Sequence, residues 1–169
     1  MSKNSDKGLT KTIPQVSLSA FSFLFGEYIH HEFHQENRIT TTQFHDKLFD
    51  LGYNLGMRMT ELISYKEKEG LRENTTDGVM NFLAKDMWRV VFGYQVNYGK
   101  VRDKANEFLI TDKNLIITEY ISYASDCNVY CVAFVAGIAQ SCMDAADFKG
   151  TVTHGEDEDG PYLHIIFQL

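Results

Sequence analysis

The chain has 169 residues, of which 44% are hydrophobic and 23% are charged, and this composition excludes intrinsic disorder as its main state. Its net charge of −7 argues against nucleic-acid binding, because phosphate recognition needs a basic surface. No stretch approaches the roughly eighteen apolar residues of a membrane span, and we expect no signal peptide. The three cysteines fall in one predicted helix, which favours reduced thiols in a cytosolic protein.

The first predicted helix is unusually apolar around its circumference. Residues 1–13 are polar and predict a flexible tail before a single domain over 14–169, and the helix is expected from about 17 to 36. One stripe has helical spacing and contains Leu18, Phe21, Phe25, Tyr28 and Ile29. Phe23, Leu24 and Phe33 fall outside that stripe. A soluble helix with a second apolar face needs a second cover, so we predict a partner subunit.

The next two predicted helices follow at short intervals. The second runs from an N-cap among residues 40–42 to about 68 and keeps its apolar residues at helical period. Gly52 and Gly56 lie four apart inside it, although each costs about 1 kcal/mol relative to alanine. Such a pair predicts that another helix crosses closely there. The third helix is expected to begin at Thr75 or Thr76 and to end at Gly93.

The periodicity changes after Gly93. Residues 94–104 are expected to be irregular, whereas 107–112 and 115–120 are predicted as two strands joined by a turn. A fourth helix is predicted from 125–126, and a final hairpin from 150–154 and 162–168. The order ααα-ββ-α-ββ predicts an α+β domain with about four helices packed on a four-stranded antiparallel sheet.

Several possible chemical sites have weak patterns. His30 and His34 are four apart on the first helix and could share a metal, but a solvated helix end is the simpler interpretation. The acidic loop at 155–160 fails to match a calcium-binding loop, so a charged hairpin turn is expected. Cys131 lies among apolar neighbours, which is typical of an inert thiol. We therefore predict no catalytic residue, no metal site and no cofactor.

Four sequence blocks resemble the small Bet-three-type subunits of the TRAPP vesicle-tethering complex. The blocks are VSLSAF at 16–21, LGYNLGMR at 51–58, WRVVFG at 88–93 and CVAFVAGI at 131–138. Their order also agrees, so the resemblance covers about residues 14–169. The Bet-three subunit proper carries an acylated cysteine after its second helix. Residues 64–78 contain no cysteine, so acylation is not carried over to this chain.

The resemblance implies helices packed on a twisted four-stranded sheet and a heterodimer with a Bet-three-type subunit through the first two helices. The residues expected at this interface are Phe21, Phe23, Leu24, Phe25, Tyr28, Gly52, Gly56 and Met59. The assembled complex would be a guanine-nucleotide exchange factor for a Rab-family GTPase in ER-to-Golgi transport. This chain would be a non-catalytic scaffold that meets other TRAPP subunits, cytoplasmic and peripheral to cis-Golgi and endoplasmic reticulum membranes.

A small-molecule sensor is the alternative, since related folds hold haem or acyl chains. Haem would need an axial ligand inside the core, but the histidines cluster at a polar helix end and on the last strand. No apolar cleft with convergent polar groups can be located from the sequence. A Soret band or an added acyl mass in the purified protein would favour the sensor.

Overall fold

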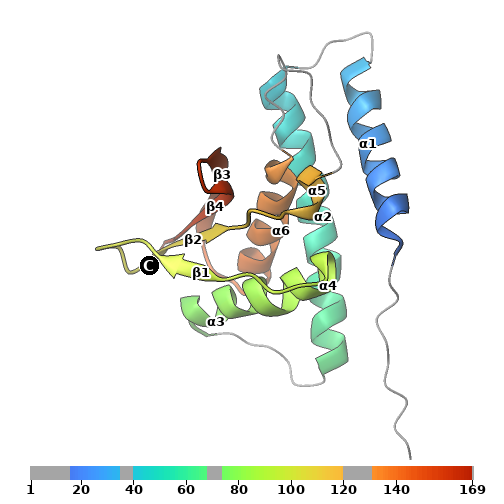
Figure 1. Cartoon of the computed structure of the whole chain (residues 1–169). Helices are drawn as coiled ribbons and strands as arrows, with labels where there is room; N and C mark the ends of the chain where they lie inside the picture. The colour runs from blue at the N-terminus through green and yellow to red at the C-terminus, as the bar shows by residue number, and fades with distance from the viewer. Residues whose placement is uncertain (1–15, 35–39, 68–73, 120–130, 169) are drawn as a thin grey trace, which may run out of the picture.

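The computed structural model describes residues 16–34, 40–67, 74–119 and 131–168. The predicted tail at 1–13 and the predicted start of the fourth helix at 125–126 lie outside this part of the chain. Within it, helices pack on one four-stranded antiparallel sheet, so the predicted α+β class is confirmed (Figure 1).

The three predicted N-terminal helices are present. The helices are α1 (Leu18–His34), α2 (Thr41–Glu67), the continuous run α3 (Thr76–Asn81), η1 (Phe82–Met87) and α4 (Trp88–Phe92), the short α5 (Ile116–Glu119) and α6 (Val132–Ala145). Thr40 opens α2 with a capping box, in which its hydroxyl accepts the Gln43 N–H at 3.3 Å and the Gln43 side chain accepts the Thr40 N–H at 3.0 Å. Gly93 ends α4 with φ +88°, a conformation that favours glycine.

The sheet differs from the prediction in its first hairpin. Its strands are β1 (Tyr98–Lys100), β2 (Glu107–Thr111), β3 (Gly150–Asp157) and β4 (Gly160–Phe167), in the order β1-β2-β4-β3 with all pairs antiparallel. The predicted strand at 115–120 is wrong because residues 116–119 form α5, where the Leu115 carbonyl accepts hydrogen bonds from the N–H and the hydroxyl of Thr118. The partner of β2 is instead β1, in a segment predicted to be irregular. The final hairpin is confirmed.

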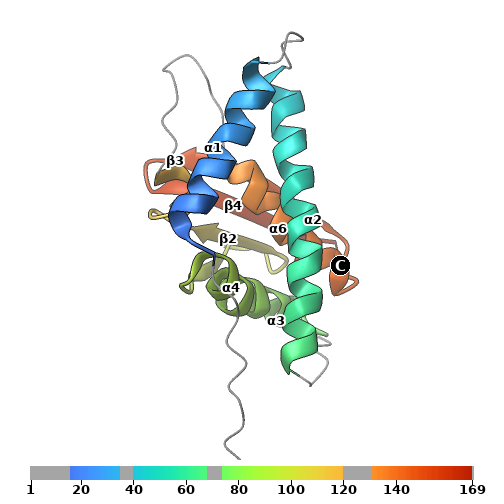
Figure 2. The same cartoon turned by 90° about the vertical axis from the view of Figure 1, so that its right-hand side faces the viewer.

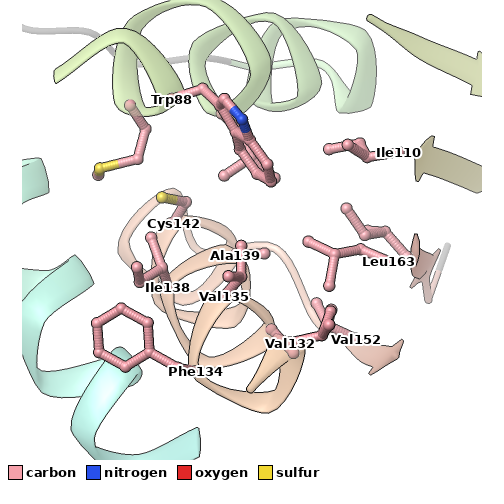
Figure 3. Packing of buried hydrophobic residues seen from close by; sticks show 14 of the residues in the cluster. Trp88, Ile110, Val132, Phe134, Val135, Ile138, Ala139, Cys142, Val152 and Leu163 are labelled. Carbon is pink, nitrogen blue, oxygen red and sulfur yellow. The ribbon is translucent and has the colours of Figure 1, made fainter. Parts of the chain in front are cut away.

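Helix α6 is the centre of the core. It lies between α2 and the sheet, and all its residues from Val132 to Ala139 are buried (Figures 1 and 2). Figure 3 shows Phe134 on the side of α6 that faces α2, and Val132 next to Val152 of β3. Its residues Val132, Val135, Ala136, Ala139 and Met143 all belong to the core.

Helices α2 and α6 cross at backbone contact. A Cβ atom added to Gly52 would lie 2.7 Å from the carbonyl carbon of Phe134, and one added to Gly56 would lie 2.9 Å from the Cα atom of Ile138. On the opposite helix, a Cβ at Gly137 would lie 2.7 Å from the backbone nitrogen of Tyr53. The close crossing predicted from the glycine pair exists, but the crossing helix belongs to the same chain.

A buried carboxylate ties the end of α4 to the end of β2. Asp112 accepts the Trp88 Nε1–H at 3.1 Å, the Tyr94 hydroxyl at 2.5 Å and the Asn114 N–H at 3.1 Å. Asp112 is only 9% exposed, and the three donors stabilise its buried negative charge. This cluster holds the chain where it leaves α4 and again where it leaves β2.

Candidate partner interface

Helix α1 has an inner and an outer side. On the inner side, Phe25 is 5% exposed, and its ring centroid lies 5.3 Å from that of Phe134 in α6. Phe21 stacks on Phe25 at 5.5 Å and is half-buried. An ion pair between Glu32 and Lys47 joins α1 to α2, and this bond raises the pKa of Lys47. The inner side of α1 therefore completes the core of its own chain.

The outer side of α1 leaves bulky apolar side chains in solvent. Phe23 is 73% exposed and Leu24 is 67% exposed, although both flank the buried Phe25 in sequence. Val16, which lies just before the start of α1, is 76% exposed. Figure 2 shows α1 and α2 side by side in front of α6, so this outer side faces away from the core. We define Val16, Phe23 and Leu24 as the α1 apolar surface.

Helix α2 contributes less of its predicted interface. Gly52 and Gly56 are buried against α6, so placing them at a partner surface is wrong, because the space beside them is filled by the chain itself. Met59 is half-buried and packs against the core. Helix α2 also exposes two apolar side chains that were not predicted at the interface, namely Leu51 at 38% and Tyr65 at 77%.

The remaining predicted residues of α1 divide between core and surface. Phe21 and Tyr28 are half-buried against the core, and burial raises the pKa of Tyr28. Phe25 belongs to the core. An interface on α1 would therefore be centred on Phe23 and Leu24, with the half-buried rings at its border.

The histidines of α1 and the acidic loop at 155–160 were the weak candidates for metal binding. His30 and His31 have exposed side chains, and the structure does not describe the side chain of His34. In the described ranges, no three His, Cys, Asp or Glu side chains gather as a metal site would require. The acidic loop is a tight hairpin turn, as predicted, in which Lys113 pairs with Asp159 at 2.7 Å.

Two hollows in the described part of the structure bear on ligand binding. The first is a partly open pocket of about 60 Å³ between α2, α3 and α6, lined by Thr60, Ser64, Val79, Phe82, Cys142, Ala145 and Ala146. Burial raises the pKa of the Cys142 thiol to about 12, and Cys131 is fully buried, so neither thiol has the character of a nucleophile. The second is an open groove of about 430 Å³ beside Asp112, with mostly polar walls. Among the described helices, none has the length and apolarity needed to cross a bilayer.

Comparison with known proteins agrees with this architecture. Residues 21–167 match the family described as transport protein particle (TRAPP) component. Trafficking protein particle complex subunit 5 of Dictyostelium discoideum is 31% identical over 88% of this chain and 80% of its own length. The subunit 5 of Bos taurus is 29% identical over 88% of this chain and 79% of its own length.

A solved structure has the same fold. It is the crystal structure of a trafficking protein particle complex subunit 3 from Naegleria fowleri covalently bound to palmitic acid. The TM-score is 0.77, with 90% of this chain and 95% of that chain covered, at 11% sequence identity. Since a family match spans nearly the whole described part of the chain and the fold agrees, the chain belongs to the TRAPP component family.

Proposed function

We propose that this chain is a non-catalytic subunit of a TRAPP complex and that its α1 apolar surface binds a Bet-three-type subunit. The observation that carries the proposal is the exposure of Phe23 and Leu24 beside the buried Phe25. Burying large apolar side chains is the main source of free energy at stable subunit interfaces. A second subunit that covers α1 would remove both side chains from water.

The wider role follows from the family. We infer that the chain helps to assemble the core of a complex that catalyses nucleotide exchange on a Rab-family GTPase during ER-to-Golgi transport. The names of its relatives, which are trafficking particle subunits, support this role. In this proposal the chain works as a scaffold on the cytoplasmic side of Golgi and endoplasmic reticulum membranes, and exchange activity belongs to the assembly.

The sensor alternative receives little support from the described hollows. The partly open pocket of about 60 Å³ is far below the roughly 300 Å³ at which small-molecule sites begin. The larger groove is open and has walls of Gln95, Asn97, Thr111 and Asn114, which do not suit an acyl chain. The palmitic acid of the subunit 3 structure therefore has no evident counterpart among the described residues of this chain.

Co-purification with a Bet-three-type subunit tests the proposal. We expect the wild-type chain to elute with the partner as a heterodimer, and Phe23→Ser with Leu24→Ser to weaken binding on the order of 100-fold. A 100-fold change in Kd corresponds to about 3 kcal/mol. This is the free energy expected if the partner buries the exposed two thirds or so of each side chain and serine cannot replace that contact. Binding of the double variant at wild-type affinity would place the interface elsewhere.

The neighbouring residue supplies the control. Phe25→Ser removes a core side chain, so it should lower the melting temperature of the isolated chain, whereas the Phe23 and Leu24 double variant should leave it unchanged. This contrast separates a lost interface from a lost fold. A double variant that unfolds the chain would mean that α1 turns its other side to the core.

A further inference from the structure

The two edges of the sheet are unequal. The strand order places β1 at one edge and β3 at the other (Figure 1). Strand β1 has three residues, and its Lys100 pairs with Asp77 at 2.8 Å, whereas β3 has eight residues. A short edge strand with a lysine resists pairing with another chain, but a long edge strand offers a row of backbone donors and acceptors. The β3 edge is therefore the edge at which a further strand can pair.

The register of the hairpin identifies the outward backbone groups of β3. Asp157 pairs with Gly160 across a two-residue turn, and such a closing pair is hydrogen-bonded. Because hydrogen-bonded and non-hydrogen-bonded pairs alternate, the odd-numbered residues of β3 bond to β4. The even-numbered residues from Gly150 to Glu156 direct their N–H and C=O groups away from the sheet.

One end of this edge is already covered. The side-chain amide of Gln140 on α6 donates to the Gly150 carbonyl at 3.3 Å and accepts the Val152 N–H at 3.1 Å. These two groups are the outward ones that the register predicts. The Gln140 amide thus takes the place of one peptide group of a neighbouring strand.

In the described part of the chain, the rest of the edge has no partner strand. Within the described residues, no protein group hydrogen-bonds to the Val152 carbonyl, to either backbone group of His154, or to the Glu156 N–H. These groups are consecutive along the edge, so they match the bonding pattern of one added strand. We define this segment, from the Val152 carbonyl to the Glu156 N–H, as the open β3 edge.

The charge beside the open β3 edge indicates what could bind there. Glu156, Asp157 and Glu158 are exposed, and in the described structure the only ion pair at this end of the hairpin joins Lys113 to Asp159. Lys113 also attracts Asp157, so among the described residues Glu156 and Glu158 are the two carboxylates left without a paired cation next to the row of open backbone groups. A strand that carries lysine or arginine would satisfy both the backbone and the charges.

We propose that the open β3 edge binds an extended basic segment of another protein as a fifth strand of the sheet. Backbone hydrogen bonds to Val152, His154 and Glu156 would fix the added strand, and the carboxylates of Glu156 and Glu158 would select positive side chains. This surface is separate from the α1 apolar surface, so the two can be occupied independently. The expected partner class is a protein with a flexible basic tail or loop.

A synthetic peptide tests strand addition. The probe is an end-blocked heptapeptide of alternating lysine and valine, and its control is the same peptide with alternate backbone nitrogens methylated, which keeps the charge but removes donors. We expect the methylated peptide to bind about tenfold more weakly by fluorescence anisotropy, since it loses backbone hydrogen bonds. The unmodified peptide should slow hydrogen exchange at the amides of His154 and Glu156.

Variants separate the contributions of charge and backbone. Glu156→Gln with Glu158→Gln should weaken peptide binding several-fold at low salt, because exposed charges are then least screened. Phe23→Ser with Leu24→Ser should leave peptide binding unchanged. Equal binding of both peptides would overturn the proposal, because the attraction between carboxylates and lysine side chains would then account for binding without backbone hydrogen bonds. No binding, or protection of residues 98–100 instead of His154 and Glu156, would overturn it as well.

Discussion

Replacing Gly52 with alanine tests the α2–α6 crossing most directly. The added methyl group would lie 2.7 Å from the carbonyl carbon of Phe134, while ordinary contacts begin at 3.4 Å. The carbonyl oxygen of Phe134 would lie closer still, so the helices would have to separate by more than 0.7 Å (3.4 − 2.7), because a backbone carbonyl cannot turn aside. Overpacking costs about 1–3 kcal/mol, and contact with backbone places this site near the upper value.

The gain in helix propensity opposes this cost. Alanine is favoured over glycine within a helix by about 1 kcal/mol, so the net destabilisation should be about 2 kcal/mol. For a chain of this length, that corresponds to a melting temperature about 4–8 °C lower, measured by circular dichroism on the purified chain.

Gly26→Ala is the matched control. Gly26 also lies inside a helix, but a Cβ atom there would have no neighbour within 4 Å. Only the propensity gain remains, so we expect a melting temperature about 2–4 °C higher. If Gly52→Ala melted at or above the wild-type temperature, as Gly26→Ala should, the close crossing of α2 and α6 would be refuted.

Three further predictions concern buried polar groups. Tyr94→Phe removes a donor to Asp112 and should lower the free energy of unfolding by about 1.5 kcal/mol in urea titrations; an unchanged value would mean that the remaining donors suffice. Cys142, whose pKa burial raises to about 12, should resist a thiol reagent at pH 8 until the chain is unfolded, as peptide mass mapping would reveal, and rapid labelling of the folded chain would contradict its burial. Burial, and to a smaller extent the nearby His45, lowers the pKa of His154 in the folded chain. At this histidine the unfolded chain therefore binds more protons than the folded chain does. Stability should therefore fall as pH drops below about 6.5, and His154→Gln should reduce that loss; an equal loss in the variant would exclude this histidine as its source.

The elements with strong periodicity could be predicted from the sequence. The buried face of α6 and the alternation of β4, in which Leu163, Ile165 and Phe167 are buried, follow from local patterns that tertiary packing reinforces. The strand predicted at 115–120 failed because its β-branched residues favour a strand locally, and tertiary packing overrides that preference here. Leu115 and Ile117 reach the core from a helical turn just as they would from a strand.

The candidate interface was harder to predict for a different reason. A glycine pair indicates a close helix crossing, but its sequence signal is the same whether the crossing helix lies in the same chain or in a partner. Gly137, the third glycine at this crossing, stands in the helix that supplies the contact. The matching glycine in a second predicted helix of the same chain is the signal that could have assigned the crossing to α6.

If a partner binds the α1 apolar surface as proposed, subunit contact and folding should be connected in this chain. Within the described residues, the attachment of α1 to the rest of the chain depends on Phe25 and Ile29, on the half-buried Phe21 and Tyr28, and on the ion pair between Glu32 and Lys47. Its outer side, with Phe23 and Leu24, gains nothing from the isolated chain. A partner that covers this side adds free energy to the docking of α1 as well as to association. Helix α1 should therefore be the element whose stability depends most on the complex.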